Sequence, residues 1–100
     1  MESSLRLYRI RPGELDAFVA EWRAAIVPLR RHFGFTVDAA WASRETDTFV
    51  WLLRYVGPDD WETADAAYYD SPERAAFDPD PARLIVDATE LRLAAVAVSP

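Results

Sequence analysis

The sequence predicts one small domain of the α+β class, with its elements in the order strand, helix, strand, strand, helix, strand. Three observations support this prediction. The chain has 100 residues, of which 51% are hydrophobic, and a chain of that length folds as a single domain spanning residues 1–100. Alternating or continuous apolar runs predict strands at residues 5–11 and 48–56. An apolar residue recurs every three or four positions from Leu15 to Phe33, which is typical of an amphipathic helix.

The first predicted strand covers residues 5–11. Side chains alternate along a strand, so Arg6, Tyr8 and Ile10 share one face and the residues between them face the other way. If the first of these faces lies under the helices, Arg6 is a buried charge and needs a partner. A Pro-Gly pair at residues 12–13 ends the strand and opens the helix.

The helix that follows carries a single apolar stripe. Its members are Leu15, Phe18, Val19, Trp22, Ile26, Leu29 and Phe33. Pro28 lies inside this helix, and because proline has no backbone N–H we expect a kink or an unsatisfied carbonyl there. Gly34 is expected just past the helix end, in the left-handed conformation that glycine adopts at little cost.

Two strands at residues 36–43 and 48–56 form a predicted hairpin, joined by residues 44–47. The segment 49–53 is apolar at every position, so this strand needs cover on both faces.

A turn at residues 57–60 precedes a second helix, whose apolar side consists of Trp61, Ala64, Ala67 and Tyr68. Ser71 is expected to cap a further short helical turn, with a proline at its first position. An extended loop at residues 78–81 follows. The last strand is expected within residues 84–98, from Ala88 onward.

This element order is that of the ferredoxin-like fold, a four-stranded antiparallel sheet with two helices on one face. Two helices cover only one face of such a sheet. Because the third strand is apolar on both sides, the other face is expected to be apolar and uncovered. A second copy packed sheet to sheet with two-fold symmetry would cover that face. We therefore predict a homodimer that forms a dimeric α+β barrel.

Composition excludes several classes of function. The net charge of −6 has the wrong sign for a nucleic-acid binder, and no apolar run is long enough to cross a membrane. The opening residues lack the features of a signal peptide, so we expect a cytoplasmic protein. All eleven basic residues are arginine, which excludes Schiff-base chemistry on a lysine. Without cysteine there is no disulfide, thiolate metal site or cysteine nucleophile.

Motifs for cofactors are also missing from the sequence. We find no phosphate-binding loop, no dinucleotide fingerprint and no nucleophile elbow. The single histidine, His32, rules out a two-histidine metal site within one chain. The acidic residues near positions 59–62 and 78–80 lack the spacing of a calcium loop. We expect neither a metal nor a cofactor.

Several motifs together resemble those of NIPSNAP-like domains. Residues 6–18, RLYRIRPGELDAF, resemble the family's opening signature, an Arg-x-Tyr-x-aliphatic-x-Pro-Gly followed by an amphipathic helix. Pro28-Leu29, HFGF at 32–35, Trp41 and DSPERAAF at 70–77 resemble later parts of the family pattern. The resemblance implies the dimeric α+β barrel superfamily, similar in plan to small cofactor-independent monooxygenases, muconolactone-type isomerases and polyketide-modifying enzymes. The superfamily also includes members without known catalysis.

Three polar residues are candidates for catalysis. His32 titrates near neutral pH and is the default general acid or base, although it could simply satisfy carbonyls at the helix end. Arg6 and Tyr8 could clamp an anion or a carbonyl, whereas the structural alternative pairs Arg6 with a carboxylate such as Glu90 on a neighbouring strand.

Four aromatic residues are candidates for substrate binding: Trp41, Trp51, Tyr55 and Tyr68. Tryptophan and tyrosine carry polar tips and commonly rim pockets. The alternative is that they pack the core or the dimer interface.

We expect a homodimer that binds a small aromatic or polycyclic molecule and acts as a cofactor-independent monooxygenase, cyclase or isomerase. Arg6 and Tyr8 would polarise an oxygen in a water-excluding pocket, and His32 would move a proton. The alternative is a non-catalytic ligand- or partner-binding dimer. A cavity of about 300 Å³ or more with Arg6, Tyr8 or His32 pointing in favours the enzyme. A packed interior with Arg6 in a salt bridge and His32 solvated favours the alternative.

Overall fold

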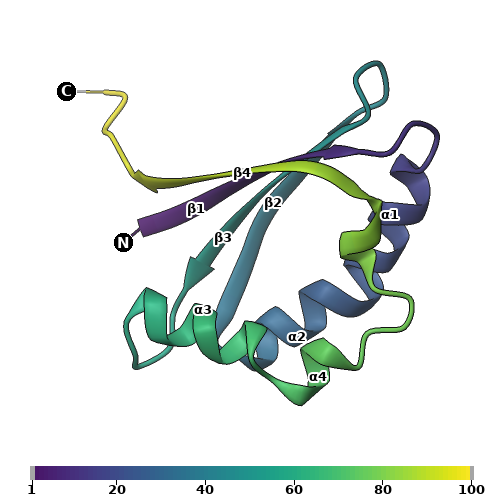
Figure 1. Cartoon of the computed structure of the whole chain (residues 1–100). Coiled ribbons are helices and arrows are strands. Elements are labelled where there is room, and N and C mark those ends of the chain that lie inside the picture. Colours follow the sequence, from purple (N-terminus) through teal and green to yellow (C-terminus); the bar gives the residue numbers. More distant parts are fainter. Residues whose placement is uncertain (1, 100) are drawn as a thin grey trace.

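The computed structural model describes residues 2–99 as a four-stranded antiparallel sheet with its helices on one face (Figure 1). The predicted ferredoxin-like α+β fold is thereby confirmed. The strands are β1 Glu2–Ile10, β2 Phe35–Ser43, β3 Thr48–Tyr55 and β4 Ile85–Ala94, in the spatial order β2-β3-β1-β4. The helices are α1 Leu15–Glu21, α2 Val27–His32, α3 Trp61–Tyr69 and α4 Pro72–Ala75, with a 3-10 turn at Pro81–Leu84. No helix in residues 2–99 is long and apolar enough to cross a membrane.

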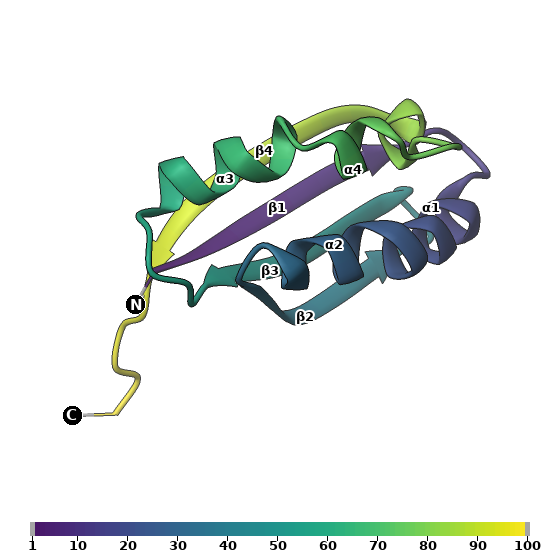
Figure 2. The same cartoon turned by 90° about the horizontal axis from the view of Figure 1, so that it is seen from below.

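The helices divide the covered face of the sheet between them. Figure 2 shows α1 and α2 running beside β2 and β3, while α3 and α4 lie along β4 and β1. The inner residues of β3, Phe49, Trp51 and Leu53, form the floor of the core and are almost completely buried. Trp22 and Phe18 from the first helical segment pack edge to face on Phe49, with ring centroids 4.9 and 5.3 Å apart. The apolar core is therefore centred between β3 and the first helical segments.

The predicted disturbance at Pro28 takes the form of a wider helical turn. A π-helical segment, Trp22–Ile26, separates α1 from α2, and the N–H of Val27 donates to the carbonyl of Trp22, five residues back. Proline cannot donate the usual bond to the preceding turn, and a π turn is one of the ways in which a helix accommodates this. The single predicted helix is therefore three consecutive segments.

The wider turn changes which side chains face the sheet. One extra residue rotates everything after it by about 100°, because an α-helix has 3.6 residues per turn. Arg30, expected on the polar side, is 1% exposed, while Leu29 from the predicted stripe is only half-buried. The predicted stripe is therefore wrong at Leu29, whereas its last member, Phe33, packs against the core. Gly34 then ends the helix with φ of 91°, as predicted.

The last strand begins earlier than expected. It starts at Ile85, which pairs with Ile10, because the 3-10 turn at Pro81–Leu84 leads straight into the sheet. It ends at Ala94, opposite Glu2. The strand-like residues beyond it, Val96 and Val98, have no neighbouring strand among the described residues and are exposed. In Figures 1 and 2 this tail projects away from the sheet.

The face of the sheet opposite the helices is apolar. Strand register aligns Leu5 with Leu52 on one side and with Leu91 on the other, and Trp41 lies opposite Val50 in the adjacent row. Within residues 2–99 no element covers this surface, which we call the open face. Trp41 and Leu91 are each about half exposed, at 55% and 51%. The predicted mismatch between apolar faces and available helices is present, and the homodimer stays a prediction.

Candidate functional site

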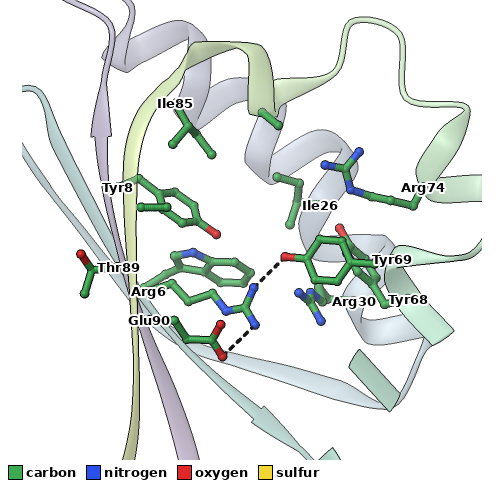
Figure 3. Close-up of a pocket in the computed structure, with 13 residues that line it drawn as sticks. Arg6, Tyr8, Ile26, Arg30, Tyr68, Tyr69, Arg74, Ile85, Thr89 and Glu90 are labelled. Atoms are coloured by element: carbon green, nitrogen blue, oxygen red, sulfur yellow. Dashed lines mark hydrogen bonds and ion pairs between the residues drawn. The ribbon is translucent and has the colours of Figure 1, made fainter. Parts of the chain in front are cut away.

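A cavity of about 300 Å³ lies between the covered face of the sheet and the helices α2, α3 and α4. Figure 3 shows the polar ends of several of its side chains converging from opposite walls. The sheet contributes residues from β1, β3 and β4, and the helices contribute four aromatic or basic residues, one from α2, two from the end of α3 and one from α4. The polar and aromatic wall consists of Arg6, Tyr8, Arg30, Trp51, Tyr68, Tyr69, Arg74 and Glu90.

Arg6 is the central charge of the site. It is 3% exposed, and its Nη1 donates to the hydroxyl oxygen of Tyr69 at 2.9 Å. Its Nη2 donates to Glu90 Oε1 at 3.3 Å and to Asp65 Oδ1 at 3.4 Å. Burial alone would lower the pKa of Arg6, but the surrounding phenol and carboxylate oxygens raise it overall, so the guanidinium stays charged. The sequence-based alternative of an Arg6–Glu90 pair is confirmed, since the two residues are direct partners across β1 and β4.

Arg30 is a second buried guanidinium beside the first. Its Nη1 donates to Asp65 Oδ1 at 2.8 Å, so this single carboxylate oxygen accepts from both arginines. The Arg30 guanidinium lies 3.7 Å from the ring centre of Tyr68 and 4.7 Å from that of Phe35, which is cation–π geometry. Asp65 on α3 is therefore the group that holds the two positive charges together.

Two tyrosines of the cavity, Tyr8 and Tyr68, have a raised pKa and are protonated at neutral pH. Burial raises the pKa of Tyr8, partly opposed by the charge of Arg6. Burial also raises the pKa of Tyr68 to about 12, against the opposing attraction of Arg30. A phenol in this state can donate a hydrogen bond but is not a base near pH 7. The cavity is thus rich in hydrogen-bond donors.

Three buried donors of the wall have no hydrogen-bond partner among the described residues. They are Nε of Arg6, Nε of Arg30 and Nε1 of Trp51. Buried donors are usually satisfied, so unpaired ones in a cavity fit a ligand that brings oxygen acceptors. Among residues 2–99 no three histidine, aspartate or glutamate side chains are grouped as metal ligands.

The structure brings together four of the seven predicted site residues. Arg6, Tyr8, Trp51 and Tyr68 line the cavity. His32 is exposed at the end of α2, where its ring meets the edge of Phe33, and it lies outside the cavity.

Trp41 and Tyr55 also lie elsewhere. Trp41 is on the open face, on the far side of the sheet. The Tyr55 hydroxyl accepts a hydrogen bond from the Asp59 N–H at 3.1 Å. Its ring packs so closely on Gly57 that a Cβ there would come within 2.2 Å of the hydroxyl. Tyr55 therefore fixes the loop before α3.

Sequence reasoning missed four residues of the site: Arg30, Asp65, Tyr69 and Arg74. The signal for Arg30 was Pro28, whose effect on helical phase turns that residue inward. Asp65 and Tyr69 are four positions apart and therefore share a face of α3. That face lies next to the one that carries Tyr68, which the sequence did predict as a site residue. Arg74, whose Nη1 pairs with Asp80 Oδ1 at 3.2 Å, gave no signal in the sequence.

Comparisons with known proteins agree on the architecture. The NIPSNAP family model matches residues 1–100. An uncharacterized NIPSNAP domain protein from Burkholderia xenovorans has a TM-score of 0.81 at 18% identity, over 100% of this chain and 99% of that chain. A NIPSNAP family protein from Agrobacterium tumefaciens has a TM-score of 0.83 at 18% identity, over 99% and 96%. An antibiotic biosynthesis monooxygenase has a TM-score of 0.68 at 18% identity, over 97% and 100%. No curated protein matches the chain. At these identities the solved structures show a shared fold and nothing finer.

Proposed function

The chain belongs to the NIPSNAP family, and from that premise we propose that its cavity binds a small aromatic or polycyclic organic molecule. The chemistry would be cofactor-independent and of the monooxygenase, cyclase or isomerase type. The observation that carries the proposal is the cavity of about 300 Å³ with Arg6 and Tyr8 in its wall. That volume is at the lower end of the range for small-molecule sites.

The chemistry of the wall supports this ligand class. Trp51, Tyr8 and Tyr68 offer flat apolar surfaces on which a planar ring can stack or pack edge to face. Arg6 is buried and permanently charged, so it can stabilise negative charge that develops on a ligand oxygen. A buried guanidinium acts more strongly there than it would in water, because the surroundings screen it less.

A second copy of the chain is part of the proposal. The open face, with its row of Leu5, Leu52 and Leu91, would pack on the same face of a second subunit. Apolar surface of this kind is costly to leave in water, and two-fold packing would cover both copies at once.

A non-catalytic ligand- or partner-binding dimer is the second candidate. One specific observation favours it: Arg6 already has carboxylate partners, and His32, the predicted proton carrier, is exposed and outside the cavity. Binding alone needs neither a free cation nor a base.

The experiment fills the cavity without removing a polar group. Ala88 lines the cavity, and Ala88→Phe should occupy much of it. We expect the wild type to bind naphthol-sized aromatic molecules in a calorimetric titration, and the variant to lose at least tenfold in affinity. Ala97→Phe, on the projecting tail, is the matched control and should bind as the wild type does. Equal binding by Ala88→Phe would place the ligand elsewhere and remove the support for the proposal.

A further inference from the structure

Glu90 is the only carboxylate in the wall of the cavity as the described residues form it. The other polar groups of the wall are three arginines, three tyrosines and a threonine, none of which is a base near neutral pH. Asp65 lies nearby, but its Oδ1 is held by both Arg6 and Arg30. Glu90 Oε1 accepts from Ser4 Oγ at 3.1 Å and from Arg6 Nη2 at 3.3 Å, but Oε2 accepts no hydrogen bond from the described residues and the side chain is 43% exposed. A proton released inside the cavity therefore has one acceptor in reach.

The charges around the cavity cancel. Arg30 is paired with Asp65, Arg74 with Asp80, and Arg6 with Glu90 and Asp65, so three cations face three carboxylates. An anionic ligand would leave this cluster with excess negative charge in a poorly screened place, which is unfavourable. A neutral ligand with an oxygen acceptor keeps the balance and can still use the unpaired Nε donors of the two buried arginines.

We propose that the substrate is an uncharged carbon or oxygen acid, namely an enolisable ketone or a phenol, and that Glu90 is the base that deprotonates it. This inference rests on the proposed function and names its substrate class. In the ketone case, Glu90 takes a proton from the carbon next to the carbonyl. The electron pair of the broken C–H bond forms the enolate, and the negative charge moves to its oxygen.

Arg6 stabilises both ends of this transfer. Before the step it faces the charged Glu90, and after the step it faces the enolate oxygen while Glu90 is neutral. The net charge of the site does not change, so no water or counter-ion has to enter. Where the ketone carries a double bond between its β and γ carbons, the enolate is a dienolate, and return of the proton from Glu90 to the γ carbon moves the double bond into conjugation, with no oxidant or other co-reactant. Glu90 thus takes the role that the sequence assigned to His32.

The experiment separates binding from proton transfer. The first probe is 2-tetralone in D2O, whose exchange of hydrogen for deuterium beside the carbonyl is followed by NMR. The second is 4-nitrophenolate, an anion that mimics the enolate, whose binding is followed by absorbance. We expect the wild type to accelerate exchange, and Glu90→Gln to reduce that acceleration by roughly 100-fold or more, as for loss of a general base. The same variant should bind 4-nitrophenolate about tenfold more tightly, because a like charge has been removed beside the anion.

Two further variants guard the interpretation. Glu45→Gln makes the same chemical change in the exposed hairpin turn and should behave as the wild type with both probes. Glu90→Asp keeps the charge but withdraws it by one methylene, so it should slow exchange without tightening phenolate binding. If the wild type neither binds nor exchanges either probe, the proposed function itself fails. If the wild type binds a probe but shows no exchange, or if Glu90→Gln matches it in both assays, the inference about Glu90 is overturned and the binding function stands.

Discussion

Alternate residues of β1 face two very different environments. Arg6 and Tyr8 point under the helices, where the structure buries charge, whereas Leu5 and Leu7 point to the open face, where apolar side chains remain accessible. In most two-layer proteins the covered face is the apolar one and the exposed face is polar. Along one strand, the covered face thus holds a charged and a phenolic side chain of the cavity wall, whereas the open face holds apolar ones. We propose a ligand for the covered face and a second subunit for the open face.

The largest expected effect comes from breaking the charge cluster on the covered face. Asp65→Ala leaves Arg6 and Arg30 buried without their shared carboxylate, and loss of one partner of a buried ion pair costs about 3–5 kcal/mol. Urea unfolding measures the change. Asp16→Ala is the matched control, because Asp16 also pairs with an arginine, Arg44, but both side chains are exposed to solvent. It should cost less than about 1 kcal/mol. Similar losses for the two variants would mean that the cluster is not specially dependent on Asp65.

A substitution on the open face is expected to have a smaller effect, and to weaken the association of subunits while leaving the stability of the fold nearly unchanged. Leu91→Arg puts a charge at the β4 end of the apolar row while leaving the core intact. We expect the dimer to weaken by more than about tenfold in sedimentation velocity, and the free energy of unfolding of the single subunit to change by about 0.5 kcal/mol or less. Val98→Arg, on the exposed tail, is the control and should leave association unchanged. A wild type that sediments as one subunit at micromolar concentration would contradict the homodimer.

The smallest expected effect is on the covered face and appears at alkaline pH. The pKa of Tyr68 rises to about 12 in the folded protein from an unfolded value of 10.0. A raised folded pKa means that its contribution to stability is complete below pH 10 and is lost as the pH rises toward 12. Tyr68→Phe should therefore flatten the decline in stability between pH 10 and 12, measured by urea unfolding at each pH. Tyr55→Phe removes a hydroxyl that lies outside the cavity and is the comparison variant.

The fold could be predicted because strands and helices leave periodic patterns of apolar residues in the sequence. Strand alternation, the apolar stripe of the first helix and the glycine at its end each depend on local sequence. Half of the site could be predicted for the same reason, since the alternation of β1 places Arg6 beside Tyr8 and opposite Glu90. The open face was also predictable, because segment 49–53 is apolar at both parities.

The remainder of the site depends on properties that a regular pattern does not contain. Arg30 was missed because the prediction assumed a regular α-helix with 3.6 residues per turn. The π-helical turn before Pro28 contains one extra residue and rotates Arg30 toward the cavity. His32 was selected for its chemistry, yet the position of α2 leaves it in solvent. Trp41 was assigned to the pocket, but its partner in the register is Val50, which faces away from the helices.

The π-helical turn before Pro28 has a consequence for comparing this protein with its relatives. A shift of one position between Trp22 and Val27 would look like a trivial gap in an alignment, because it leaves every neighbouring motif recognisable. In three dimensions the same gap would turn the rest of α2 by more than a quarter of a revolution and replace a guanidinium in the cavity with a leucine. Family members that differ by that single insertion would keep the architecture but line this cavity with different side chains.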